Sequence, residues 1–154
     1  MRIAKWFFLW FVFVSGPVFA EQALPQGATE ALVTAAIKGR DLVLSRHYDQ
    51  ATLHFKQLEL AYPNSALGLF GQMAIVQSKM FENFDFRGDE ELKNIAEKLK
   101  LINRSVLKNE ASSAWELYLT GSSSGVMAFY YVRADQLLKA LSAAGDTKQA
   151  LERA

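Results

Sequence analysis

Three observations predict an all-α fold for this chain of 154 residues. From Thr29 onward, apolar residues recur at intervals of three, four and seven, which is the spacing of one face of an α-helix. No run alternates strictly between apolar and polar residues for more than a few positions, as a half-buried strand would. Of the three prolines, at positions 17, 25 and 63, only Pro63 lies inside the helical pattern. We therefore expect helices joined by short loops.

Residues 1–20 have the features of a secretory signal peptide. Two bases are followed by an uninterrupted run of nine apolar residues, 6–14, and a Gly-Pro pair then precedes the small residue Ala20. Because a transmembrane helix needs about 20 apolar residues, this run is short for a membrane span. We expect cleavage after Ala20 and a periplasmic or secreted protein. Retention of the segment as a membrane anchor is the alternative.

The composition of the chain after Ala20 excludes some classes of function. Residues 1–20 hold two of the 17 bases and none of the 16 acids, which leaves 15 bases, 16 acids and a net charge of −1 with histidine neutral. This balance argues against nucleic acid as the main partner. The chain has no cysteine, so an apolar core rather than disulfides must hold the exported domain, and thiolate zinc sites are excluded.

A short linker and six helices are expected after the signal peptide. Residues 21–28 contain proline and glycine without periodicity and are interpreted as a linker. Pro63 ends the second helix, since proline cannot continue a helix. We expect Asp89 to cap the fourth helix and either Ser112 or Ser113 to cap the fifth. The predicted helices span about residues 29–46, 48–61, 65–82, 88–108, 111–133 and 135–152.

Small and large side chains follow a defined spacing around Ala51. Gly39 stands twelve residues before Ala51, and Leu42 stands nine residues before it. Phe55 follows four residues after Ala51, and Pro63 follows twelve residues after it. This spacing resembles the tetratricopeptide repeat, a helix–turn–helix unit of about 34 residues.

The match covers residues 32–65 and implies how the two helices pack. Gly39 and Ala51 would lie where the helices cross, because a larger side chain there would push them apart. Leu42 and Phe55 would fill the space beside the crossing. An unrelated αα-hairpin is the alternative, since these residue types are common in helices.

The resemblance implies that residues 29–154 form about three helix pairs, stacked as a short right-handed superhelix. The later pairs depart from the pattern of the first. Either Gly71 or Met73 can take the crossing position in the second pair, and Ala140 can take the place of Ala51 in the third.

The stretch "TGSSSGV", residues 120–126, is rich in small side chains. Gly121 and Gly125 are four residues apart, which is also the spacing of a transmembrane dimer motif. The flanking charges of Glu116 and Arg133 leave too short an apolar span for membrane insertion. We therefore predict a stripe of small residues against which another helix packs closely.

No motif predicts catalysis, a cofactor or a metal site. His47 and His54 have no convergent carboxylate or cysteine in the sequence pattern, and we expect both on the surface. The acidic segment 82–91 lacks the ligand spacing of a calcium loop. We expect a solvated loop with helix-capping acids there, with weak divalent-ion binding as the alternative. Phosphate-binding glycine loops and Ser/His/Asp arrangements are absent from the sequence, so we expect no enzymatic activity.

In tetratricopeptide repeats the first helix of each pair lines a concave face that binds peptides and partner proteins. The resemblance therefore implies a partner-binding groove on the first and third predicted helices. Its residues are Val33, Ala36, Ile37, Arg40, Leu67, Phe70, Ala74 and Gln77. This set is mostly apolar with one cation, which favours an apolar or helical partner segment over a charged tail. The alternative is that the protein's own terminal helix covers these residues.

The sequence favours a non-catalytic periplasmic scaffold that binds an envelope protein or peptide segment in this groove. We expect no cofactor and no stable membrane insertion once the signal peptide is cleaved. The alternative is a small helical bundle that binds an apolar ligand or lipid between Phe70, Trp115 and Phe129. No feature of the sequence indicates an oligomeric state.

Overall fold

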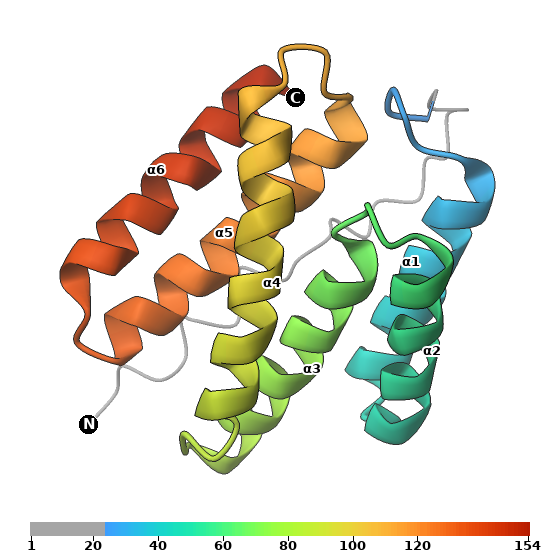
Figure 1. Cartoon of the computed structure of the whole chain (residues 1–154). Coiled ribbons are helices and arrows are strands. Elements are labelled where there is room, and N and C mark those ends of the chain that lie inside the picture. The colour runs from blue at the N-terminus through green and yellow to red at the C-terminus, as the bar shows by residue number, and fades with distance from the viewer. Residues whose placement is uncertain (1–23) are drawn as a thin grey trace, which may run out of the picture.

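The computed structural model describes residues 24–154, and the predicted signal peptide with its cleavage after Ala20 lies outside the described residues. Within residues 24–154 the chain forms six α-helices and no strand, which confirms the all-α prediction (Figure 1). The helices are α1 (Glu30–Leu44), α2 (Tyr48–Ala61), α3 (Leu67–Asn83), α4 (Asp89–Lys108), α5 (Ala114–Arg133) and α6 (Leu137–Arg153).

Local capping explains where several helices begin. The Thr29 side chain accepts a hydrogen bond from the backbone N–H of Leu32 and so caps α1. Ser113 caps α5 in a reciprocal capping box with Glu116. The cap of α4 is Gly88 rather than the predicted Asp89, which lies one residue inside the helix. The carboxylate of Asp89 and those of two further acids in the first turn interact favourably with the positive end of the helix dipole.

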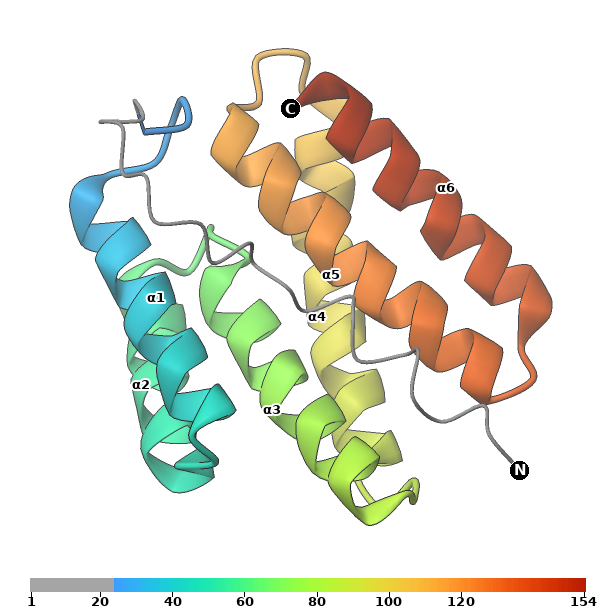
Figure 2. The same ribbon diagram turned by 180° about the vertical axis from the view of Figure 1, so that it is seen from behind.

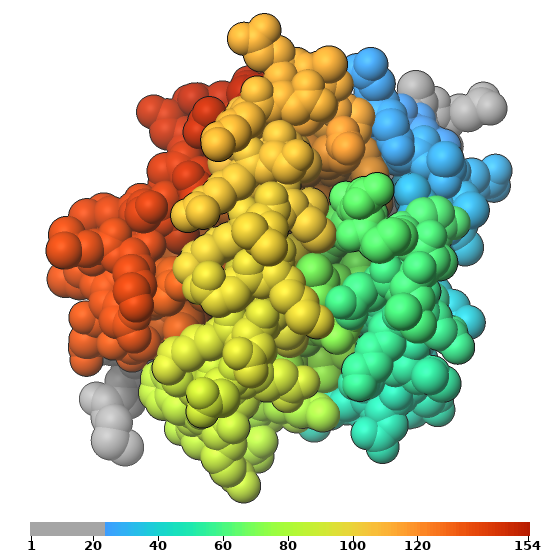
Figure 3. Space-filling model, viewed as in Figure 1, coloured from blue at the N-terminus to red at the C-terminus, as the bar shows by residue number. Residues whose placement is uncertain are grey.

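The helices pack in two layers. Helix α3 contacts both α1 and α5, so α1, α3 and α5 lie side by side, with α2 and α4 behind them in Figure 2. The opposite face of the molecule carries α4 along its middle, with α6 on one side and α2 on the other (Figure 3). Among residues 24–154, every helix–helix contact joins helices that are one or two positions apart along the chain.

The ring of Phe55 on α2 organises the junction of the first three helices. It is buried, and it lies against Gly39 of α1 and Gly71 of α3. A Cβ atom added at Gly39 would lie 2.2 Å from Cζ of Phe55, and one added at Gly71 would lie 2.1 Å from its Cδ1. Of the two residues that the sequence left open in the second pair, Gly71 makes the close approach, whereas Met73 is a fully buried core residue.

Polar contacts tie the turn between α1 and α2 to the end of α3. The Tyr48 hydroxyl donates a 2.8 Å hydrogen bond to Glu82, and Arg46 forms an ion pair with the same carboxylate at 2.7 Å. Burial and this hydrogen bond raise the pKa of Tyr48 to about 12. The first and second helix pairs are therefore joined at this end as well as through Phe55.

Helices α5 and α6 approach closely along the predicted stripe of small residues. A Cβ atom added at Gly121 would lie 2.8 Å from Cδ2 of Leu151, and one added at Gly125 would lie 3.6 Å from Oγ1 of Thr147. The prediction of close helix packing at this stripe is confirmed. None of the helices in residues 24–154 is long and apolar enough to cross a membrane.

Candidate interaction surface

Seven of the eight residues of the predicted groove keep accessible surface on α1 or α3. Val33, Ala36, Phe70 and the other partly buried members leave some of their side-chain surface accessible, and Ile37 is the most open at 45%. Leu67 is different because it is only 4% exposed. The first turn of α3 packs tightly on α2, since a Cβ atom added at Gly68 would lie 2.4 Å from the backbone nitrogen of Glu59. Leu67 is therefore a core residue, and its assignment to the groove is wrong.

The cation of the predicted groove is engaged within the protein. Two guanidinium nitrogens of Arg40 donate hydrogen bonds of 3.0 and 2.8 Å to the Asp41 carboxylate. Arg40 therefore adds little net charge to the surface, and the α1–α3 face is apolar with a neutralised ion pair at its side. The side-chain amide of Gln77, on α3, is the remaining polar group of the predicted set.

Two depressions of the described surface are shallow, and neither follows the predicted groove along its length. One, of about 390 Å³, runs along α1 from Thr34 to His47 and includes only Ile37 of the groove residues. The other, of about 260 Å³, lies where Phe86 and Asp89 meet the turn between α5 and α6. Both are wide open, so each is an extended surface rather than an enclosed site.

The three aromatic residues of the alternative ligand site take part in packing. Trp115 is buried, its ring stacks on Tyr118 with centroids 6.1 Å apart, and its backbone N–H donates to the carbonyl of Gln26. The ring of Phe129 packs on Phe81 with centroids 5.4 Å apart. Neither depression of the described surface is lined by Phe70, Trp115 or Phe129.

The histidines hold structural positions. Nε2 of His54 lies 2.8 Å from the carbonyl oxygen of Ala35, and because a carbonyl only accepts, this nitrogen donates. His54 is thus half-buried and joins α2 to α1, in contrast to the surface position expected of it, whereas His47 is exposed at the start of α2. Within residues 24–154, no three His, Cys, Asp or Glu side chains gather closely enough to hold a metal ion.

The segment predicted as an acidic loop also presents aromatic rings. We call residues 81–88, which are the last three residues of α3 and the turn that leads to α4, the aromatic turn. Phe81, Phe84 and Phe86 are all exposed, and the Arg133 guanidinium of α5 lies 4.7 Å from the ring of Phe81 and 4.8 Å from that of Phe86. Sequence reasoning weighed only the acids here, although three phenylalanines within six residues of a turn were a signal in the sequence itself.

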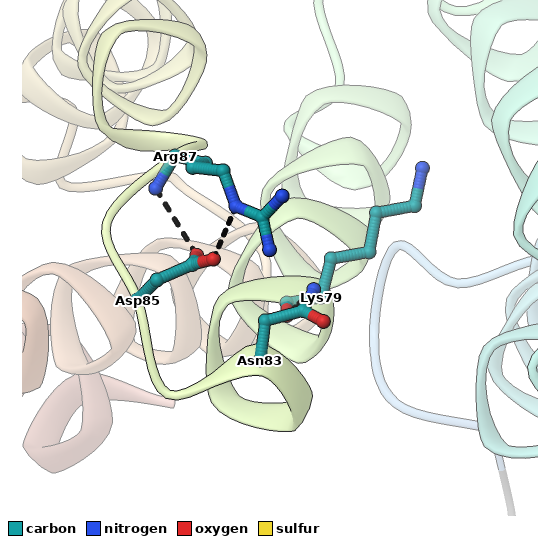
Figure 4. A network of polar contacts seen from close by, with 4 residues as sticks. All are labelled: Lys79, Asn83, Asp85 and Arg87. Atoms are coloured by element: carbon teal, nitrogen blue, oxygen red, sulfur yellow. Dashed lines mark hydrogen bonds and ion pairs between the residues drawn. The ribbon is translucent and has the colours of Figure 1, made fainter.

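One acid of the aromatic turn, Asp85, holds the shape of the turn. The Asp85 carboxylate accepts hydrogen bonds from the backbone N–H of Arg87, at 3.1 Å, and from the Arg87 guanidinium (Figure 4). These bonds lower the pKa of Asp85. Beside them, the Asn83 side chain donates to the carbonyl of Lys79 at 2.9 Å. The turn therefore has a defined internal structure.

Comparison of the chain with protein-family models, with curated proteins and with solved structures gave no match. Functional inference therefore starts from the chain's own surfaces, which are the α1–α3 face and the aromatic turn.

Proposed function

We propose that this protein is a non-catalytic interaction scaffold of the tetratricopeptide-like class, exported to the periplasm or secreted, that holds a segment of an envelope protein against the α1–α3 face. The observation that carries the proposal is the order of helix contacts. Contacts in residues 24–154 join only helices one or two positions apart, so α1 and α6 do not meet as they would in a closed bundle. Stacks of helix pairs have this one-dimensional order and use the shared face of their first helices for binding.

The chemistry of the α1–α3 face selects the kind of segment. Its accessible side chains are apolar at Val33, Ile37 and Phe70, and the charge of Arg40 is offset by Asp41. Burying apolar area on both partners is favourable at about 25 cal/mol per Å². An apolar strand or the apolar side of an amphipathic helix therefore fits this face better than a charged chain terminus does.

The proposal is tested with two matched substitutions in the chain from residue 21 onward. Ile37→Asp places a charge on the α1–α3 face, and Leu53→Asp places the same charge on α2, where Leu53 is also exposed. We expect Ile37→Asp to reduce capture of an envelope protein about tenfold or more, since a buried unpaired charge is costly, and Leu53→Asp to leave it unchanged.

We expect both variants to remain helical, because both positions are solvent-exposed in the native chain, and circular dichroism checks this. Equal capture by the native protein and both variants would move the interface away from the α1–α3 face. Loss of capture with Leu53→Asp alone would assign binding to α2 and contradict the proposal.

A further inference from the structure

A third surface of the described chain lies on α6, at one edge of the molecule (Figure 1). Among the helices of residues 24–154, α6 contacts only α4 and α5. We call Leu137, Leu141, Ala144 and Lys148 the α6 stripe, since intervals of four and three place them on one side of the helix. All four are exposed, with Leu137 at 63% and Leu141 at 70%. Neighbouring exposed leucines of this kind are typical of an interaction surface.

The first and third helix pairs are joined by turns of the same geometry. Arg46 in the first pair and Asp135 in the third have a left-handed backbone, at φ 61° and 56°. In both turns the N–H of the next residue donates to the carbonyl five residues before it, at 2.9 and 2.8 Å. The alignment of Ala140 on Ala51 places these two turns on one another, and both alanines are buried. Helices α2 and α6 are therefore equivalent members of their pairs.

On α2, the side that corresponds to the α6 stripe is covered by α3. The ring of Phe55 lies against Gly71. Earlier on α2, the Tyr48 hydroxyl donates to Glu82 near the end of α3, so the two helices run antiparallel. The α6 stripe is thus the place where an antiparallel helix would follow, and no helix of residues 24–154 covers it. The α2 residues that correspond in order to the stripe are Tyr48, Thr52, Phe55 and Glu59.

The α6 stripe is complementary to itself in an antiparallel arrangement. With a two-fold axis between positions 141 and 144, Leu141 of each copy lies opposite Ala144 of the other, so a large side chain meets a small one. The same register places Leu137 opposite the aliphatic stem of Lys148. The Lys148 amine stays in solvent, where it pairs with Glu152 of its own helix at 3.7 Å. A surface that complements itself in this way suits an isologous contact between two copies.

The charges of α6 argue against an anionic lipid surface as the occupant. Lys139 lies 5.7 Å from the centre of the Tyr131 ring. Arg153 donates to two backbone carbonyls at the C-terminal end of α4, and Lys148 forms the ion pair described above. Helix α6 contains no other base. Its cations are therefore engaged within the protein, whereas a helix that lies on a membrane presents free lysines and arginines to the lipid headgroups.

From these observations we infer that the chain forms a two-fold dimer in which the α6 stripes of two copies pack antiparallel against each other. The contact continues the stack of helices, because α6 meets a second α6 at the positions where α2 meets α3. It leaves the α1–α3 face open, since α6 contacts neither α1 nor α3. The dimer presents that face twice, but the inference itself does not depend on the proposed groove.

Sedimentation velocity of the full chain, purified in the form that the expression host exports, tests the inference over a range of concentrations. We expect a monomer–dimer equilibrium. Leu141→Asp places an unpaired charge in the contact on both copies and should weaken association about a hundredfold or more. Leu101→Asp on α4 is the matched control, because Leu101 is 71% exposed and Leu141 is 70% exposed. The control should associate as the native chain does.

An exchange of two side chains tests the antiparallel register. Leu141→Ala removes the large side chain, and Ala144→Leu adds a second large one, so each change alone should weaken association about tenfold. The double variant again places a large side chain opposite a small one and should associate within about threefold of the native chain. Both positions are exposed in the single chain, so circular dichroism should show native helix content for all three variants.

Several results would overturn the inference. A monomer at every concentration would show that no second copy covers the α6 stripe. A dimer that Leu141→Asp leaves intact, or that Leu101→Asp weakens equally, would place the interface elsewhere. Failure of the double variant to recover association would contradict the antiparallel register. Binding of a monomeric native chain to phosphatidylglycerol vesicles, lost with Leu141→Asp, would assign the stripe to a lipid surface instead.

Discussion

Two regions of the molecule bring helices into close contact by different means. At the junction of α1, α2 and α3, one large ring, that of Phe55, lies between two glycines, Gly39 and Gly71. Between α5 and α6, Gly121 instead faces the aliphatic side chains of Ala150 and Leu151. The α5–α6 contact is nevertheless the most extensive in residues 24–154, because small residues let two helices approach along much of their length.

The spacing pattern shows why the two regions differ. When Ala140 takes the place of Ala51, the position of Phe55 falls on Ala144, which is exposed. In this alignment Ala140 is buried, as Ala51 is, but no ring stands four residues after it. The buried Phe55 ring between two glycines cannot move to make room for an added methyl group. The half-exposed Leu151 side chain can do so by changing its rotamer. We therefore expect substitutions around Phe55 to lower the free energy of unfolding much more than equivalent substitutions between α5 and α6.

The largest effect is expected for Phe55→Ala. Removing this buried ring leaves a cavity that three helices share, and we expect the free energy of unfolding to fall by about 3–5 kcal/mol. Urea denaturation followed by circular dichroism measures the change. The control Leu53→Ala, exposed on the same helix, should change stability by about 0.5 kcal/mol or less. A loss below about 1 kcal/mol for Phe55→Ala would break the comparison by showing that the helices close over the gap.

For Gly71→Ala we expect the free energy of unfolding to fall by about 2–3 kcal/mol, because the new methyl group overlaps the Phe55 ring. The same change at Gly121 should cost about 1 kcal/mol or less, since the end of the Leu151 side chain can move. Adding Phe55→Leu to Gly71→Ala should recover part of the loss, and a double-mutant cycle measures that coupling. Additive effects of the two substitutions would contradict the proposed ring–glycine contact.

The smallest effect, and one of opposite sign, is expected for Gly145→Ala in α6. A Cβ atom added at Gly145 meets nothing within 4 Å, and alanine is favoured over glycine inside a helix by about 1 kcal/mol. We expect the free energy of unfolding to rise by about 0.5–1 kcal/mol, measured from a higher midpoint in thermal denaturation. A lower midpoint would show that the outer side of α6 is packed against another surface in solution.

Sequence reasoning succeeded where the signals were local or regularly spaced. The six helices follow from periodicity and from breakers such as Pro63, and the close approach at Gly39 follows from its spacing to Phe55. It failed where burial depends on a distant element. Leu67 was assigned to an open groove, but the contact of α2 with the first turn of α3 buries it. His54 was expected on the surface, but its partner Ala35 lies on another helix.

By itself the sequence determined that residues 24–154 form six helices and that small residues recur at the points where those helices pack. Helix formation depends on residues within about four positions of one another, and the sequence contains that local information. Only the tertiary structure decided that Gly71 rather than Met73 lies against Phe55, and that Phe84 projects into solvent while Leu67 does not. The exposure of a side chain depends on atoms brought to it from elsewhere in the chain, and no local pattern contains that information.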